Sequence, residues 1–87
     1  MALKGMNVDT GAQAAQQINA GASELEALTG RMTNVIQGFE WFGPDADRTR
    51  EQWNSEYATM LRQVQAQLQE FSQLISREVQ QQIAVSQ

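Results

Sequence analysis

The segment Glu40-Trp41-Phe42-Gly43-Pro44-Asp45 lies at the middle of this 87-residue chain and contains its only proline. Gly43 has no Cβ, so it can adopt the positive φ that a sharp chain reversal requires. Pro44 suits the first position of a helix, where its missing N–H is not needed, and the acidic residues that follow it would favour the positive end of the helix dipole. The segment therefore predicts a reversal at residues 40–44, between two helices.

The residues before this break predict one long amphipathic helix. Apolar or small side chains recur there at alternating steps of three and four, which is the spacing of one face of a helix. Thr10 and Gln13 fit a capping box, with Asp9 beside them, so the helix is expected to start near Asp9 and to cover about 9–39. This first stripe consists of Val8, Gly11, Ala15, Ile18, Ala22, Leu25, Thr29, Met32, Ile36 and Phe39, widened by Ala12, Leu28 and Val35.

The residues after the break repeat the pattern and predict a second helix at about 45–84. Its solvated face is rich in glutamine, which has a good helix propensity. The second stripe consists of Ala46, Thr49, Trp53, Tyr57, Met60, Val64, Leu68, Phe71, Ile75, Val79 and Ile83, widened by Leu61 and Leu74.

Two helices of about 30 residues form a narrow rod with few side chains between them. Both stripes hold more apolar positions than a two-helix seam can bury, and small scaffolds with thin cores commonly gain stability by association. The sequence thus predicts an all-α, single-domain chain (1–87), an antiparallel helix-turn-helix hairpin that dimerises into a four-helix bundle. The side chains expected in its core or dimer interface are Ile18, Leu25, Leu28, Met32, Val35, Ile36, Phe39, Trp53, Tyr57, Met60, Leu61, Val64, Leu68, Phe71 and Ile75.

The composition excludes several classes of function. The chain has no His and no Cys, which rules out Cys or His zinc sites, disulfides, a Ser-His-Asp triad and a thiol nucleophile. Six basic residues against 10 acidic ones give a net charge of -4, which disfavours nucleic acid as a partner. Acidic residues two apart on a helix do not share a face. We therefore expect no enzyme activity, no cofactor, no metal and no small-molecule substrate.

The charged residues after the turn are expected to form weak surface ion pairs. Asp47 with Arg50, and Arg48 with Glu51, have the three-residue spacing of such pairs. The N-terminal residues lack the apolar run of a signal peptide, and no stretch reaches the length of a membrane span. These features predict a soluble protein that does not use the general secretory route.

The turn resembles a known family signature. Trp41-Phe42-Gly43 between two long helices is similar to the Trp-x-Gly turn of the WXG family, the Esx-type proteins of roughly 100 residues that type VII secretion systems handle. The resemblance covers nearly the whole chain. The continuation Pro44-Asp45-Ala46-Asp47-Arg48, followed by Trp53, looks like the actinobacterial branch of that family.

Two positions depart from the family pattern. Thr49 stands where relatives often carry a large apolar residue, which predicts weaker packing just after the turn. Family members that carry the export signal usually have Tyr-x-x-x-Asp or Tyr-x-x-x-Glu beyond the second helix, whereas the only tyrosine here is Tyr57. If the chain is exported, the resemblance implies that a paired chain supplies the signal or that a less conventional tail does so.

The resemblance implies a small, non-enzymatic type VII secretion substrate or escort from a family associated with virulence. Its implied partners are an identical chain or a paralogous Trp-x-Gly hairpin, together with the secretion machinery, and its implied location is outside the cell after a cytoplasmic stage, without a signal peptide. Trp41 and Gly43 would contribute to recognition, although a Trp41 ring that only closes the end of the bundle is an equal expectation. The alternative is a cytosolic adaptor or chaperone hairpin that docks onto a larger helical partner such as a secreted toxin.

Overall fold

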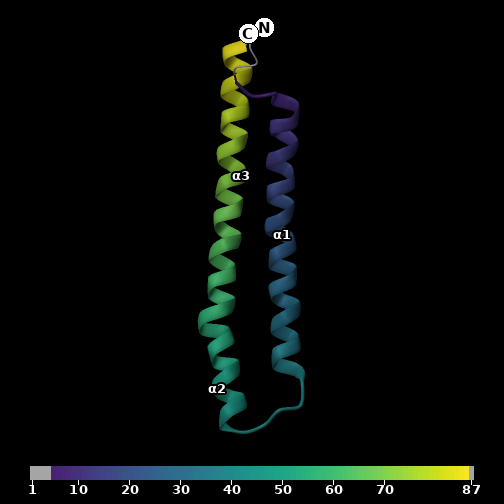
Figure 1. Ribbon diagram of the computed structural model, residues 1–87, viewed down its shortest axis with the longest axis vertical. Coiled ribbons are helices and arrows are strands. Elements are labelled where there is room, and N and C mark those ends of the chain that lie inside the picture. Colours follow the sequence, from purple (N-terminus) through teal and green to yellow (C-terminus); the bar gives the residue numbers. More distant parts are fainter. Residues whose placement is uncertain (1–4, 87) are drawn as a thin grey trace.

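The computed structural model describes residues 5–86, and within this range it contains helices and no strand. The elements are α1 (Val8–Gly38), α2 (Pro44–Gln52), the π-helical segment η1 (Trp53–Tyr57) and α3 (Ala58–Ser86). The last three follow one another without a break, so they form one long helix that returns alongside α1 (Figure 1). The rod measures 67 × 17 × 16 Å. The predicted all-α hairpin is confirmed.

Helix α1 begins at Val8, one residue before the predicted start, and its cap differs from the predicted one. Asn7 is the N-cap, and its Oδ1 accepts hydrogen bonds from the backbone N–H groups of Asp9 and Thr10 at 3.1 and 3.2 Å. Thr10 already lies in the first turn, where its hydroxyl donates to the Asn7 carbonyl. The capping box predicted at Thr10 is therefore wrong, because Asn7 supplies the acceptor three residues earlier.

Two rows of side chains form the seam between α1 and α3. The first, which we call the small-residue row, is buried except at half-buried Gln65, and its two sides meet where Ser72 Oγ donates to the Ala15 carbonyl at 2.7 Å. The second, the large-residue row, is half-buried. Both rows repeat every seven residues, as expected for two helices that pack along their length. The small-residue row is Ala15, Ala22 and Thr29 on α1 with Ala58, Gln65, Ser72 and Val79 on α3; the large-residue row is Ile18, Leu25 and Met32 with Leu61, Leu68 and Ile75.

The predicted stripe of the second helix coincides with this seam only in part: its residues Leu61, Leu68, Ile75 and Val79 lie in the two rows. Tyr57, Met60, Val64 and Phe71 are exposed on the hairpin, whereas Ala58, Gln65 and Ser72 take the seam positions of α3. The predicted stripe assumes a regular α-helical period from Trp53 onward. The chain instead makes one π-turn at η1, which inserts an extra residue between Trp53 and the next seam residue, Ala58.

Trp53 shows why the π-turn matters for packing. Its indole Nε1 donates to Thr33 Oγ1 on α1 at 2.9 Å, so the ring reaches across the seam. Buried Ala46 lies seven residues before Trp53 in α2, and Ala58 lies five residues after it in α3. In a regular α-helix, the seam position before Ala58 would lie four residues earlier, so Asn54 and not Trp53 would occupy it. The extra residue therefore keeps an aromatic ring between the helices.

Candidate functional site

The turn between α1 and α2 has the backbone that the sequence predicts. Gly43 has φ 115° and ψ 178°, a conformation that side chains with a Cβ rarely adopt. It is the N-cap of α2, and its carbonyl accepts a hydrogen bond from the Asp47 N–H at 3.0 Å. Pro44 opens α2. The predicted roles of Gly43 as the reversal residue and of Pro44 as a helix-starting residue are both confirmed.

Arg50 holds this turn from the opposite helix. Its guanidinium donates three hydrogen bonds to backbone carbonyls: Nε to Ile36 at 2.9 Å, Nη1 to Trp41 at 2.8 Å and Nη2 to Phe39 at 2.8 Å. Helix α1 has no basic residue in its own last turn. Because the last carbonyls of a helix lack partners within it and carry partial negative charge, a cation there is favourable. Arg50 supplies that cation.

The ion pairs predicted after the turn are wrong. Arg50 donates to the three backbone carbonyls and does not pair with Asp47. Arg48 pairs with Asp45 at the exposed start of α2 and not with Glu51. Arg50 was missed as a turn residue because its partners lie nine to fourteen positions earlier. The sequence does hold one indication of this role. The last predicted turn of the first helix has no basic residue, so a cation for its carbonyls has to come from another element.

Trp41 is half-buried and its ring stacks on Phe39, with centroids 5.8 Å apart and planes inclined by 25°. Its neighbour Phe42 behaves differently, since 85% of that residue is exposed. The Trp41 ring thus has a packed edge and an accessible one, and its backbone is anchored by Arg50. Both expectations for Trp41, closing the end of the bundle and presenting a surface, fit this position.

An apolar hollow of about 240 Å³ lies beside the turn and is named here the aromatic hollow. Rings of Trp53 and Tyr57 stack nearby, with centroids 6.2 Å apart. Two of its lining residues, Phe39 and Tyr57, are exposed. Its lining consists of Ile36, Phe39, Trp41, Thr49, Arg50, Gln52, Trp53 and Tyr57.

The predicted core or interface residues fall into two groups. Eight are half-buried and pack between the helices, namely Ile18, Leu25, Met32, Ile36, Trp53, Leu61, Leu68 and Ile75. Seven are exposed on the hairpin: Leu28, Val35, Phe39, Tyr57, Met60, Val64 and Phe71. The structure thus assigns the first group to the core of the hairpin, and the interface role of the second group stays a prediction.

The exposed group lies on one side of the rod. Leu28 and Val35 follow the large-residue row of α1 by three residues, and Val64 and Phe71 follow the large-residue row of α3 by the same step. Residues three apart on a helix are neighbours, so these side chains extend that row away from the small-residue row. We call the seven exposed residues, together with exposed Leu74, the apolar face.

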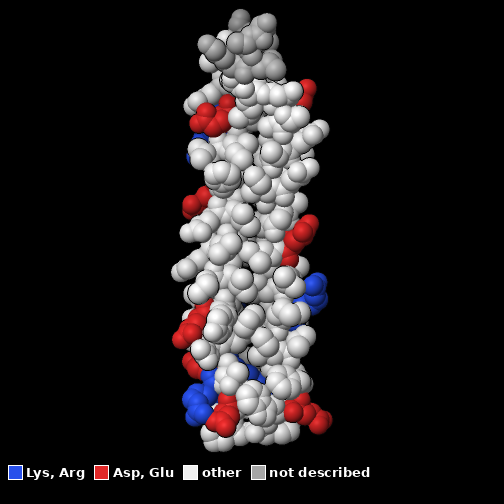
Figure 2. All heavy atoms as spheres, in the orientation of Figure 1, with Lys and Arg blue, Asp and Glu red and all other residues white. Residues whose placement is uncertain are grey.

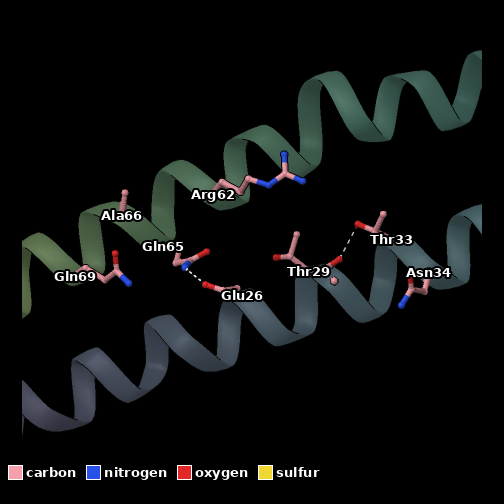
Figure 3. A pocket seen from close by; sticks show the side chains of 9 residues that line it. Glu26, Thr29, Thr33, Asn34, Arg62, Gln65, Ala66 and Gln69 are labelled. Carbon is pink, nitrogen blue, oxygen red and sulfur yellow. Dashed lines mark hydrogen bonds between the residues drawn. The ribbon is translucent and has the colours of Figure 1, made fainter.

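The opposite side of the rod is polar. A groove there lies between α1 and α3 over the small-residue row, and Figure 3 shows Gln65 and Glu26 pointing toward each other across it, with Gln65 Nε2 donating to Glu26 Oε2 at 2.6 Å. The groove is lined mostly by polar side chains, in contrast to the apolar face. Figure 2 draws the rod in the orientation of Figure 1, and on the side that it shows charged groups are scattered singly along most of the length and gather near the turn.

Within residues 5–86, no cluster of three or more acidic, His or Cys side chains is placed to hold a metal ion. No helix in that range has both the length and the apolar character needed to cross a membrane. Comparisons with protein-family models, curated proteins and solved structures find no match for this chain. The assignment to the WXG family therefore stays a prediction that rests on the residues of the turn.

Proposed function

We propose that this chain is a small, non-enzymatic substrate or escort of a type VII secretion system, and that it works as a dimer of helical hairpins. The observation that carries the proposal is the turn: Trp41 keeps an accessible edge while Arg50 and Phe39 hold it in place, next to the reversal at Gly43. A motif that must be read by another protein benefits from such fixed geometry, because little freedom is lost on binding.

The dimeric part of the proposal rests on the apolar face. Eight large side chains, from Leu28 to Leu74, are exposed along one side of a rod that is only 17 × 16 Å in cross-section. Contiguous apolar surface of this kind is typical of an interaction site. A second hairpin, identical or paralogous, would cover it and complete a four-helix bundle.

The test compares two substitutions in the same turn. Trp41→Ala removes the ring of the motif, whereas Phe42→Ala removes a neighbouring ring that is exposed and lies at the variable position of Trp-x-Gly. Both proteins are expressed with the secretion system of their source, and the culture supernatant is assayed for each. Melting temperature and oligomer mass are measured on the purified proteins.

We expect Trp41→Ala to fold and dimerise but to stay in the cells, and Phe42→Ala to be exported normally. Normal export of folded Trp41→Ala would contradict the recognition role of the turn. Loss of folding in Trp41→Ala would instead assign the ring to structural packing.

The apolar face also favours a second candidate, an adaptor hairpin that docks onto a larger helical protein such as a secreted toxin. The two candidates differ in what accompanies the chain. An adjacent gene for a second Trp-x-Gly hairpin with a Tyr-containing tail favours the secreted pair, and an adjacent toxin gene favours the adaptor. Light scattering on the pure chain separates them further, because a stable homodimer has no free apolar face for a toxin.

A further inference from the structure

The turn is held by a side chain more than by its own backbone. Within residues 5–86, two backbone–backbone hydrogen bonds lie outside the helices, one at the start of α1 and one at the start of α2. Neither involves residues 39–42, the segment that carries the tryptophan of the motif. The described hydrogen bonds to the carbonyls of this segment come from Arg50, at Phe39 and at Trp41. One side chain therefore sets the path of the segment.

Arg50 also ties this segment to the end of α1. Its Nε donates to the Ile36 carbonyl in the last turn of that helix, and its guanidinium lies over the Phe39 ring, on which the Trp41 ring stacks. Arg50 thus restrains Trp41 twice, through the Trp41 carbonyl and through the ring beneath the indole. All three guanidinium nitrogens donate to carbonyls of the chain itself, so Arg50 acts on other molecules only through Trp41.

The Trp41 ring has a competing position beside it. The residue is half-buried and lines the aromatic hollow. The hollow has a volume of about 240 Å³, and cavities of about 150 Å³ already hold a benzene molecule. Because burial of apolar surface is favourable, an unrestrained indole would turn into the hollow and lose its accessible edge. The accessible position of the ring therefore needs a restraint on the backbone that carries it.

We propose that Arg50 is the positioning residue of the turn motif. It fixes the backbone at Phe39 and Trp41, keeps the indole out of the aromatic hollow and so presents the accessible edge of the ring to the protein that recognises it. The inference rests on the proposed function, in which the secretion machinery recognises Trp41. It assigns the presentation of the motif to a residue outside Trp-x-Gly, on the second helix of the hairpin.

The first measurement follows the Trp41 ring itself. The chain holds two tryptophans, so the full-length protein labelled with fluorotryptophan gives two fluorine NMR signals, and Trp41→Phe assigns them. In Arg50→Gln, the Trp41 signal should move and should lose most of its isotope shift between light and heavy water. The reason is that the released ring is buried in the hollow and no longer faces solvent.

Two control variants separate positioning from charge and from stability. Arg48→Gln removes a guanidinium two residues away, which pairs with Asp45 on the exposed surface. Val79→Ala truncates a residue that is 4% exposed and lies near the end of the rod opposite the turn, so it lowers stability without a change at the turn. In both controls, the Trp41 signal should keep the position and the isotope shift of the parent protein.

The second measurement is export from cells that contain the secretion system of the source. Export of Arg50→Gln should fall at least tenfold, whereas Arg48→Gln and Val79→Ala should match the parent. Helical circular dichroism at the growth temperature and oligomer mass are measured for each variant, so a loss of export is not confused with a loss of folding.

Arg50→Lys keeps the charge but replaces the planar fork by one ammonium group. It should lie between the parent and Arg50→Gln, both in the fluorine signal of Trp41 and in export. If Arg50→Gln does not fold, the same two measurements on Arg50→Lys decide: a parent-like signal or parent-like export would overturn the positioning role.

An unchanged Trp41 signal in folded Arg50→Gln would overturn the proposal even if export fell. Normal export of Arg50→Gln, or an equal loss of export in Val79→Ala, would overturn it as well. These failures are distinguishable from failure of the proposed function. If Trp41→Ala stays in the cells while Arg50→Gln is exported, recognition of the ring stands and its positioning by Arg50 is wrong. Normal export of folded Trp41→Ala removes the recognition role, and the fluorine signals still show whether Arg50 places the ring.

Discussion

Arg50 contacts Phe39 in two ways at once. Its Nη2 donates to the Phe39 carbonyl at 2.8 Å, and its guanidinium carbon lies 5.3 Å from the centroid of the Phe39 ring. The first contact is a charge-assisted hydrogen bond and the second is a cation–π interaction. Because Phe39 is the C-cap of α1, one side chain of α2 ends the first helix and orders the ring on which Trp41 stacks.

Replacing Arg50 by Ala should therefore destabilise the hairpin more than any exposed charge does. The three carbonyls of Ile36, Phe39 and Trp41 would lose a charged donor, with an expected cost of about 2 to 3 kcal/mol in the free energy of unfolding. Arg50→Lys should recover only part of this, because an ammonium group cannot present three donors in a planar fork. Chemical denaturation followed by circular dichroism measures both.

Arg48→Ala is the matched control for Arg50. Arg48 is an arginine two residues away whose guanidinium pairs with Asp45 on the exposed surface, so its removal should cost about 0 to 1 kcal/mol. Equal destabilisation by the two alanine substitutions would show that the carbonyl contacts of Arg50 do not stabilise the turn.

Gly43→Ala should destabilise the hairpin by about 1 to 3 kcal/mol, because a Cβ is strained at φ 115° even though no atom lies within 4 Å of it. Gly38→Ala is the control. It adds the same Cβ at the end of α1, also in open space, without a positive φ. It should leave the stability unchanged or raise it slightly. A Gly43→Ala protein with the parent melting temperature would contradict the conformational role of Gly43.

Deleting Ser55 tests the π-turn. The deletion removes the extra residue of η1, so Trp53 and Ala58 would be four positions apart and could share the seam of a regular α-helix. We expect the protein to stay folded, with Trp53 still near Thr33. Deleting Gln67 from the regular part of α3 should instead rotate the seam by about 100° and abolish cooperative melting. Similar melting curves for the two deletions would refute this account of η1.

Two glycines of α1 should respond in opposite directions to alanine. A Cβ at Gly30 meets no atom within 4 Å, so Gly30→Ala should stabilise the helix by about 1 kcal/mol. A Cβ at Gly11 would lie 3.1 Å from Val79 Cγ2 and would overlap Met6 Sδ, so the same change there should destabilise the protein. Thermal melting of both variants measures the two changes in stability. Stabilisation by Gly11→Ala would mean that the helix ends pack less closely than described.

The sequence alone determined the two helices, the position of the reversal and the residues that make it. These features depend on local chemistry: Gly43 tolerates a positive φ, Pro44 starts a helix, and the apolar period of residues 8–39 is helical regardless of what packs against it. Within α1, the predicted stripe also identifies the seam, because that helix is regular throughout and its period does not drift.

Only the tertiary structure decided which residues of the second helix face α1 and which stay exposed. Tyr57, Val64 and Phe71 continue a regular helical period from Trp53, but the contact between Trp53 and Thr33 is accompanied by a π-turn that shifts every later residue by one position. The role of Arg50 is likewise decided across the seam, by carbonyls of α1 left without partners at its end. Periodicity describes one helix at a time, whereas a seam depends on how two helices meet.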